Sequence, residues 1–201
     1  MIHIERDLIE SGFKSIAGVD EAGRGSCAGP LVVAAVILEN PLGSIWSGIK
    51  DSKLLKESVR EELFDLITNC ALSYSILEIS VAEIDDLGLH RANLEGMRRA
   101  VQGLDRIPEF VLTDGYPIAG LDMATLAVWK GDQVSISIGA ASILAKVFRD
   151  RRMVQLDQTL PGYGLSKHKG YVTAAHSRAL IELGPSIQHR KSFANVKALL
   201  T

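Results

Sequence analysis

Acidic side chains at the ends of short apolar stretches are the first sign of chemistry in this sequence. The stretches are residues 15–19, 110–113 and 126–129, and each is followed within three residues by a carboxylate. One such residue alone is most often a turn or cap residue, because turns favour Asp. Several together indicate a shared site, and the four candidates are Asp20, Glu21, Asp114 and Asp132.

The chemistry depends on whether these stretches are neighbouring strands. Strand ends lie about 5 Å apart across a sheet, so carboxylates placed there converge on a small volume. Unpaired carboxylates repel one another unless a cation lies between them, and Mg²⁺ or Mn²⁺ prefers such oxygen ligands. Two such ions about 4 Å apart catalyse phosphodiester hydrolysis. Asp20 is our choice for the ligand shared by both ions, because it leaves the predicted central strand.

Asp20 and Glu21 are adjacent, which poses a geometric problem for a shared site. Neighbouring residues of a regular strand point to opposite faces of the sheet. We therefore expect the strand to break at this pair, and Gly23 and Gly25 follow at once.

The segment Gly23-Arg24-Gly25 reads as a loop with unusual backbone angles. It is not a dinucleotide fingerprint, because Ala28 stands where a third glycine is needed and a strand-like run, residues 30–38, follows in place of a helix. A tight hairpin explains the glycines without any function. Alternatively, they let main-chain groups approach a sugar or phosphate closely, with Arg24 adding a charge-assisted contact.

The elements that would position these residues follow from apolar periodicity. The run at residues 30–38 predicts a buried strand, and residues 73–80 predict another. The order of strands and helices favours an α/β class with a mixed sheet and a single domain spanning residues 1–201. We predict helices over residues 54–70, 81–104, 138–156, 173–183 and 194–200, and a loop over residues 160–170.

Charge is distributed unevenly along the chain. The net charge is −2, but from Leu144 onward ten basic residues face three acidic ones, so this mostly helical part carries +7. A phosphate-binding face and an ordinary solvated face explain this equally well.

Bulk properties limit the other classes of protein. Two cysteines are too few for a disulfide framework or a four-cysteine zinc site. No apolar run approaches the roughly 20 residues of a membrane helix, and the first ten residues do not resemble a signal peptide. We expect a cytoplasmic protein, a monomer, with no membrane partner.

Eight motifs together resemble the ribonuclease HII family, the prokaryotic type 2 ribonuclease H. They occur in the family's order over nearly the whole chain, and the combination of the first with the sixth is highly specific. The motifs are GVDEAGRG (18–25), GPLVVAAVIL (29–38), DSK (51–53), TDG (113–115), KGD (130–132), AASILAKVFRDR (140–151), HKGY (168–171) and HRKSF (189–193).

The resemblance implies a ribonuclease H-like fold, with a central mixed sheet flanked by helices and a helical C-terminal part. It maps the family's metal-binding acids onto Asp20, Glu21, Asp114 and Asp132, with Mg²⁺ or Mn²⁺ as cofactor. The implied reaction is hydrolysis of the RNA strand of RNA–DNA hybrids. It includes cleavage 5′ of ribonucleotides embedded in duplex DNA, leaving 3′-hydroxyl and 5′-phosphate ends. Such an enzyme would serve ribonucleotide excision in DNA replication and repair.

The resemblance also suggests how substrate is recognised. The loop Gly23-Arg24-Gly25 would contact the ribose 2′-hydroxyl through its backbone, and Tyr171 would pack against the sugar. The 2′-hydroxyl is what distinguishes RNA from DNA at one nucleotide. We further expect the basic residues to grip phosphates. The additional substrate-binding candidates are Ser142 at a helix start, Lys146, Arg149, Lys167, His168 and Lys169.

Two other interpretations require different residues from this hydrolase. A hybrid-binding protein without chemistry would keep the basic face but lose a metal ligand, whereas all four acids are present here. The related ribonuclease HIII carries a Glu-Glu pair and an extra N-terminal domain, whereas this chain has Asp20-Glu21 near its start.

Overall fold

A mixed five-stranded sheet forms the centre of the protein in the computed structural model, which describes residues 4–49 and 52–200. The strand order is β3-β2-β1-β4-β5, so the first strand lies in the middle. It pairs antiparallel with β2 and parallel with β4. The strands are β1 (Ile16–Ala22), β2 (Leu31–Leu38), β3 (Ala71–Ile79), β4 (Phe110–Asp114) and β5 (Ala124–Val128).

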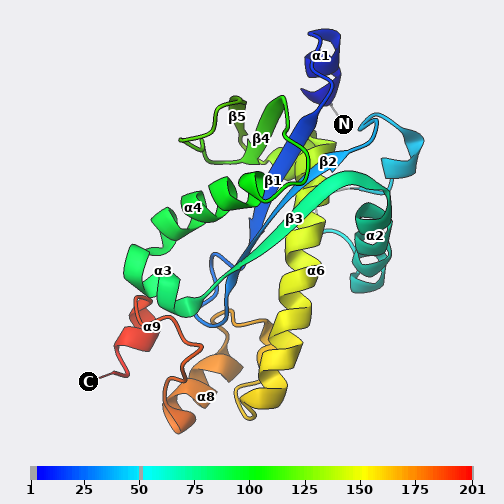
Figure 1. The fold of residues 1–201 in the computed structure, drawn as a ribbon. Coiled ribbons are helices and arrows are strands. Elements are labelled where there is room, and N and C mark those ends of the chain that lie inside the picture. The colour runs from blue at the N-terminus through cyan, green and yellow to red at the C-terminus, as the bar shows by residue number, and fades with distance from the viewer. Residues whose placement is uncertain (1–3, 50–51, 201) are drawn as a thin grey trace.

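Helices cover both faces of this sheet (Figure 1). On one face, α2 (Glu57–Cys70) and α6 (Ile136–Thr159) enclose a hydrophobic core with alternate residues of β2. On the other face, α3 (Val81–Leu87) and α4 (Leu89–Gln102) enclose a second core. Every residue of β2 is buried, which explains why its sequence is a continuous apolar run. The expected α/β architecture with a mixed sheet is confirmed.

The remaining elements lie at the ends of the sheet. The helix α1 (Ile4–Glu10) lies at one end, and the C-terminal segment lies beyond the other end (Figure 1). A short helix, α7, occupies part of segment 160–170, which we had predicted to be a loop. The shorter elements are a 3₁₀ turn at Ser44–Trp46, α5 (Gly131–Val134), α7 (Leu165–His168), α8 (Ala174–Leu183) and α9 (Ala194–Lys197).

The strand β1 does not break at its acidic pair, and this prediction was wrong. Asp20 pairs with Ala34 and Glu21 with Val33, and the ladder continues to Ala22. The reason is that β2 keeps supplying hydrogen-bond partners along this edge after the pairing of β1 with β4 has ended.

The helix α6 begins at Ile136, earlier than predicted, and its first turn is already capped. The Ser135 hydroxyl accepts the Ile138 N–H at 3.1 Å, and the buried Glu5 carboxylate accepts the Ser137 N–H at 2.9 Å. A carboxylate there stabilises the helix through its dipole. Ser142 therefore lies in the second turn, which removes the argument that a helix start would bring phosphate to it.

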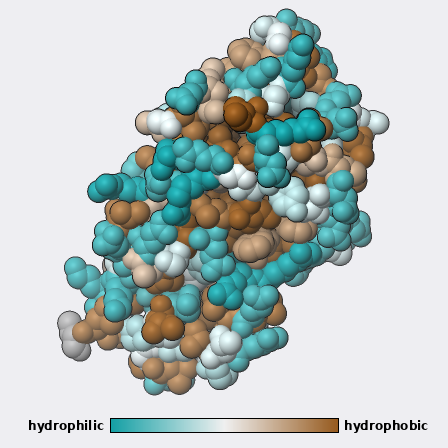
Figure 2. Space-filling view, viewed as in Figure 1, coloured by the Kyte–Doolittle hydropathy of each residue, from teal (hydrophilic) through white to brown (hydrophobic). Residues whose placement is uncertain are grey.

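On the face seen in Figure 2, hydrophilic and hydrophobic residues are mixed. Figure 2 shows that hydrophilic residues (teal) cover most of the viewed face, with hydrophobic residues (brown) exposed between them in small groups. In the described part of the chain, no helix is both long and apolar enough to cross a membrane.

Candidate active site

Two of the four predicted acids extend a pair of parallel strands. The register of β1 with β4 ends where Val19 pairs with Thr113, and the next residues are Asp20 and Asp114. Neighbouring strands lie about 4.8 Å apart, so both carboxylates start from the same end of the sheet. The Asp114 carboxylate accepts the Gly131 N–H at 2.7 Å, which ties it to α5.

Asp20 and Glu21 lie on opposite faces of β1, as an unbroken strand requires. Asp20 is 5% exposed and faces α6, where the Ser142 hydroxyl lowers its pKa. Glu21 faces α4. The Asn93 amide there is close enough to oppose the rise in the pKa of Glu21, although neither of its polar atoms makes a hydrogen bond within normal limits among the described residues. The pair therefore straddles the strand end, with Asp114 close enough to raise the pKa of both.

The fourth acid, Asp132, reaches the site from the first turn of α5. It is buried, and one of its carboxylate oxygens lies 3.8 Å from the Lys53 Nζ. It shares a cavity of about 420 Å³ with Glu21 and Asp114. Lys53 belongs to the DSK motif, whose Asp51 lies outside the described residues.

The acids crowd one another electrostatically. Burial, and then the charges of Glu21 and Asp114, raise the pKa of Asp20 well above its usual range. Burial and the charge of Asp114 raise the pKa of Glu21 to about 7, although the Arg24 charge opposes this. Such shifts mean that the folded chain holds negative charge at a free-energy cost that a bound cation would relieve.

The donor chemistry fits a hard divalent cation. All four side chains offer carboxylate oxygens, and the buried Glu21 Oε2 has no hydrogen-bond partner among the described residues. Within those same residues, no three His, Cys, Asp or Glu side chains already form a group that could hold a metal ion. The fit therefore rests on the charge, burial and oxygen donors of the acids.

The glycine loop lies beside the acids and touches the predicted tyrosine. A second cavity, of about 430 Å³, is lined by Asp20, Gly23, Gly25, Lys146 and Tyr171, among other residues. A side chain at Gly25 would lie 3.7 Å from the Tyr171 ring. The structure thus brings the loop and two of the acids, Asp20 and Glu21, together with Tyr171, which is remote from them in sequence.

Gly23 needs to be glycine for two reasons. Its φ of +92° lies in the region that other residues avoid, and a Cβ there would overlap the Arg149 guanidinium. Beside it, the Arg24 guanidinium hydrogen-bonds the Tyr116 hydroxyl and lies 4.5 Å from that ring's centroid. Arg24 therefore lines both cavities while its guanidinium is held by Tyr116.

Arg149, which we had placed among the basic gripping residues, is internal, and so is Arg190. Arg149 is 1% exposed and donates to the carbonyls of Ala28, Pro30 and Lys169. Arg190 is fully buried and donates to the carbonyls of Gly29 and Arg24. The expectation that Arg149 grips phosphate is corrected, because its donors hold loop carbonyls. Arginine is rarely buried, so the sequence alone did not indicate that these two side chains are internal.

The other predicted substrate residues divide by position. Lys146 lines the second cavity and pairs with Asp150 at 2.6 Å. Lys167 is exposed and Lys169 is half-buried on the neighbouring loop. Ser142 is buried, lines the same cavity and lies 2.9 Å from the Ser52 hydroxyl.

His168 has a structural role that the sequence did not indicate. Its Nε2 donates to the Tyr163 carbonyl at 2.8 Å, and its Nδ1 accepts the Gly170 N–H at 3.2 Å. Both ring nitrogens are thus used inside the loop, which corrects the expectation that His168 contacts phosphate.

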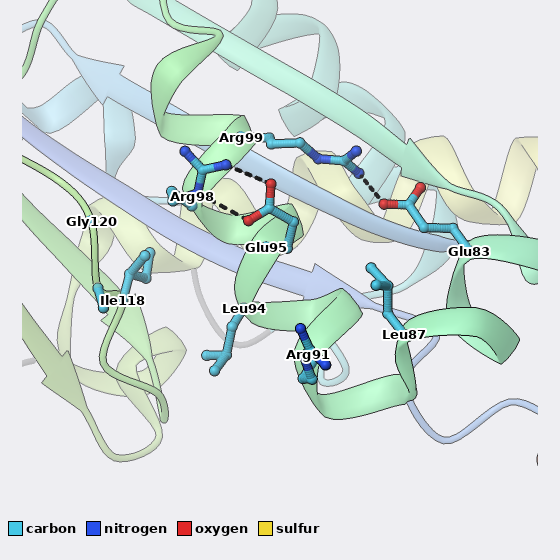
Figure 3. Close-up of a pocket in the computed structure, with 10 residues that line it drawn as sticks. Glu83, Leu87, Arg91, Leu94, Glu95, Arg98, Arg99, Ile118 and Gly120 are labelled. Carbon is cyan, nitrogen blue, oxygen red and sulfur yellow. Dashed lines mark hydrogen bonds and ion pairs between the residues drawn. The ribbon is translucent and has the colours of Figure 1, made fainter.

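A larger cavity, of about 800 Å³, lies away from these residues (Figure 3). It is bounded by α3, α4 and the segment at Ile118–Gly120, and none of the four acids lines it. Its charged rim is largely closed on itself, because Arg98 pairs with Glu95 at 2.6 Å and Arg99 with Glu83 at 3.0 Å. This cavity therefore does not have the character of the catalytic site.

Known proteins match this arrangement along most of the chain. The family profile described as Ribonuclease HII matches residues 17–196. A ribonuclease HII from Salinispora arenicola is 54% identical over 193 residues, which cover 96% of this chain and 72% of that protein. The solved ribonuclease H2 from Pyrococcus horikoshii is similar with a TM-score of 0.80 and 26% identity, covering 92% of this chain and 96% of that one. A Bst ribonuclease HIII solved in complex with Mn²⁺ shares the fold at 21% identity, with a TM-score of 0.67, covering 94% of this chain and 70% of that one.

Proposed function

The chain belongs to the ribonuclease HII family and is a ribonuclease H, and on that premise we propose how and where it cuts. It hydrolyses the RNA strand of RNA–DNA hybrids and incises duplex DNA on the 5′ side of an embedded ribonucleotide. Water adds to the phosphorus and the bond to the upstream O3′ breaks. The products are a 3′-hydroxyl and a 5′-phosphate on the ribonucleotide.

The observation that carries this proposal is the crowded acidic group beside the glycine loop. Asp20, Glu21, Asp114 and Asp132 would hold two Mg²⁺ or Mn²⁺ ions, with Asp20 shared between them. When bound, the ions would lower the pKa of the attacking water and stabilise the leaving oxygen. The raised pKa values of Asp20 and Glu21 support this assignment, because burial and like charges disfavour negative charge that a bound cation would stabilise.

Substrate selection would come from the second cavity. The backbone of Gly23-Arg24-Gly25 would contact the 2′-hydroxyl, while the Tyr171 ring, which is 43% exposed, would pack against the sugar. The anchored carbonyls support this role, because Arg190 binds the Arg24 carbonyl and Arg149 binds the Ala28 carbonyl further along the same segment before substrate arrives. A preorganised loop loses little conformational entropy on binding.

Phosphate binding would rest on the lysines that remain near the cavity. Lys146 lines it, and Lys167 and Lys169 lie on the adjacent loop, where they would grip the backbone without reading sequence. Ser142 would act through Asp20 by lowering its pKa.

The test is product mapping on three matched duplexes: one with a single ribonucleotide, one fully RNA–DNA, and one all DNA. With Mg²⁺ or Mn²⁺ we expect cutting of the first two and not of the third, and none in EDTA. The single-ribonucleotide product should carry a 3′-hydroxyl immediately 5′ of the ribonucleotide. Binding without cleavage would favour a hybrid-binding protein, and cutting on the 3′ side would contradict the assignment of the sensor loop.

A further inference from the structure

Three histidines, two of them buried and one half-buried, form a cluster beside the segment that carries Tyr171. The rings of His168 and His176 stack with centroids 4.2 Å apart, and those of His176 and His189 lie 5.2 Å apart. His176 is fully buried and His189 is 1% exposed. They face the Cys27 thiol and the Tyr163 ring. We call His168, His176 and His189 the histidine cluster.

Hydrogen bonds determine where the protons of this cluster lie. The Ser186 N–H donates to His189 Nδ1 at 3.0 Å, so a neutral His189 carries its proton on Nε2. That nitrogen lies 3.0 Å from His176 Nε2, which must then accept. His176 therefore carries its proton on Nδ1 and donates it to the Tyr171 carbonyl at 2.9 Å.

The same assignment follows from the other end of the chain of bonds. A carbonyl oxygen only accepts, so the contact with the Tyr171 carbonyl requires a proton on His176 Nδ1. A second proton on either ring would turn two N–H groups toward each other or toward the Ser186 N–H. Burial lowers the pKa of both histidines, that of His189 to about 4, so both are neutral near pH 7.

This bond completes the anchoring of the loop backbone. The carbonyls of residues 168–170 accept from the Tyr171 N–H, from Arg149 and from the Cys27 N–H, at 2.9 to 3.0 Å. Lys169 and Gly170 have φ values of +52° and +80°, a turn that needs such anchoring to persist. The Tyr171 carbonyl is the last of the series, and the side chain of the same residue places its ring beside Gly25.

We propose that His176, held in its Nδ1–H form by His189, is a positioning residue that fixes the Tyr171 main chain and thereby sets the preference for single embedded ribonucleotides. The inference rests on the proposed function, because it takes Tyr171 as the residue that packs against the sugar. A long hybrid offers many phosphate contacts, whereas a lone ribonucleotide depends on one correctly placed ring.

The kinetic test compares His176→Phe with His176→Gln on the single-ribonucleotide duplex and the full hybrid. The glutamine amide can donate to the Tyr171 carbonyl and accept from His189, whereas phenylalanine can do neither. We expect His176→Phe to lower kcat/KM on the lone ribonucleotide about tenfold, mostly through KM, and to change the hybrid less than about threefold. His176→Gln should remain within about threefold on both substrates.

Coupling to the tyrosine provides the decisive control. In Tyr171→Ala, adding His176→Phe should cause no further loss on the lone ribonucleotide, because residues that act as one unit are not additive. Additive losses, or equal losses on both substrates, would overturn the positioning role while leaving the proposed function intact. Failure of the unmodified chain to cut the lone ribonucleotide would instead overturn the proposed function.

A measurement on the unmodified chain covers the case in which His176→Phe does not fold. Nitrogen-15 NMR of the histidine rings distinguishes the two neutral forms directly. We expect His176 as the Nδ1–H form and His189 as the Nε2–H form at pH 7. The opposite form for His176, or a charged ring, would contradict the proposal.

Discussion

The acidic group and the histidine cluster are both joined to the segment at residues 23–30, and they differ in how their polar atoms are satisfied. Asp20 lies in the strand that leads into this segment, while His189 bridges to Ala28 near its end. In the histidine cluster every ring nitrogen has a partner. In the acidic group one buried oxygen of Glu21 has none among the described residues, and like charges raise the pKa of its members.

The difference separates a scaffold from a binding site. Buried polar networks that are fully paired add rigidity and specify one conformation. Charges gathered without compensation destabilise the fold and are retained where a ligand supplies the missing charge. Both kinds of cluster contain titratable residues, so residue type alone does not distinguish them.

Asp20→Asn should have the largest effect of the variants, and that effect is on cleavage by the acidic group. Removing the carboxylate removes a proposed metal ligand, so we expect kcat to fall on the order of 10³-fold or more under Mg²⁺. Binding of a full hybrid, measured by gel shift, should change less than about threefold, because the phosphate contacts remain. Asp122→Asn, an exposed acid outside the cavities, is the matched control. Near-normal cleavage by Asp20→Asn would refute the assignment.

Gly170→Ala should destabilise the loop that the histidine cluster anchors. The added Cβ would overlap the Ala28 carbonyl at a φ of +80°, whereas at Gly184, with a φ of +73°, it would meet nothing within 4 Å. Gly184→Ala therefore measures the backbone cost alone. We expect Gly170→Ala to cost roughly 1–3 kcal/mol more by urea unfolding, and to lower cleavage of a lone ribonucleotide. Equal costs at the two positions would mean that the loop relaxes freely.

The stability of Glu21→Gln should depend on pH in a direction set by the raised pKa of Glu21. Above pH 7 the folded, metal-free chain holds this carboxylate charged at a cost, and the cost is relieved as pH falls from about 7 toward its ordinary value of 4.5. Glu21→Gln should thus be roughly 1–3 kcal/mol more stable than the unmodified chain at pH 8, and about equal at pH 4.5.

Metal provides the control for that measurement. Saturating Mg²⁺ should stabilise the unmodified chain more than Glu21→Gln and so reduce the difference at pH 8. The histidine cluster should show the opposite pH dependence. Because the pKa of His189 is lowered in the folded chain, the free energy of unfolding should decrease as pH falls from 6.5 toward 4. A pH-independent gain for Glu21→Gln would show that crowding of charge is not its cause.

Lys146→Ala should have the smallest effect. We expect hybrid affinity to fall by about threefold to tenfold, equally for all sequences, with the slope of log affinity against log salt reduced by about one. Lys197→Ala, on the exposed side of α9, should leave both unchanged. An unchanged salt slope in Lys146→Ala would mean that its pairing with Asp150 is its whole role.

Local pattern was sufficient for much of this protein. The apolar runs predicted all the strands of the sheet, most clearly β2, because residues buried on both faces must be apolar. The acids were found because they follow those runs. Helix boundaries were less accurate, since the first turn of α6 is set by Glu5, a residue more than a hundred positions away.

What the tertiary structure alone decided is which polar residues face inward and with what partner. The sequence offered Arg149 and His168 as surface contacts. Folding instead turns the Arg149 guanidinium toward the carbonyls of Ala28 and Pro30, which are remote in sequence, and His168 bonds within its own loop. It also left Asp20 and Glu21 on opposite faces of an unbroken strand, because β2 extends the ladder past the end of β4. Burial and hydrogen-bond pairing are properties of the whole packed chain, so no local pattern contains them.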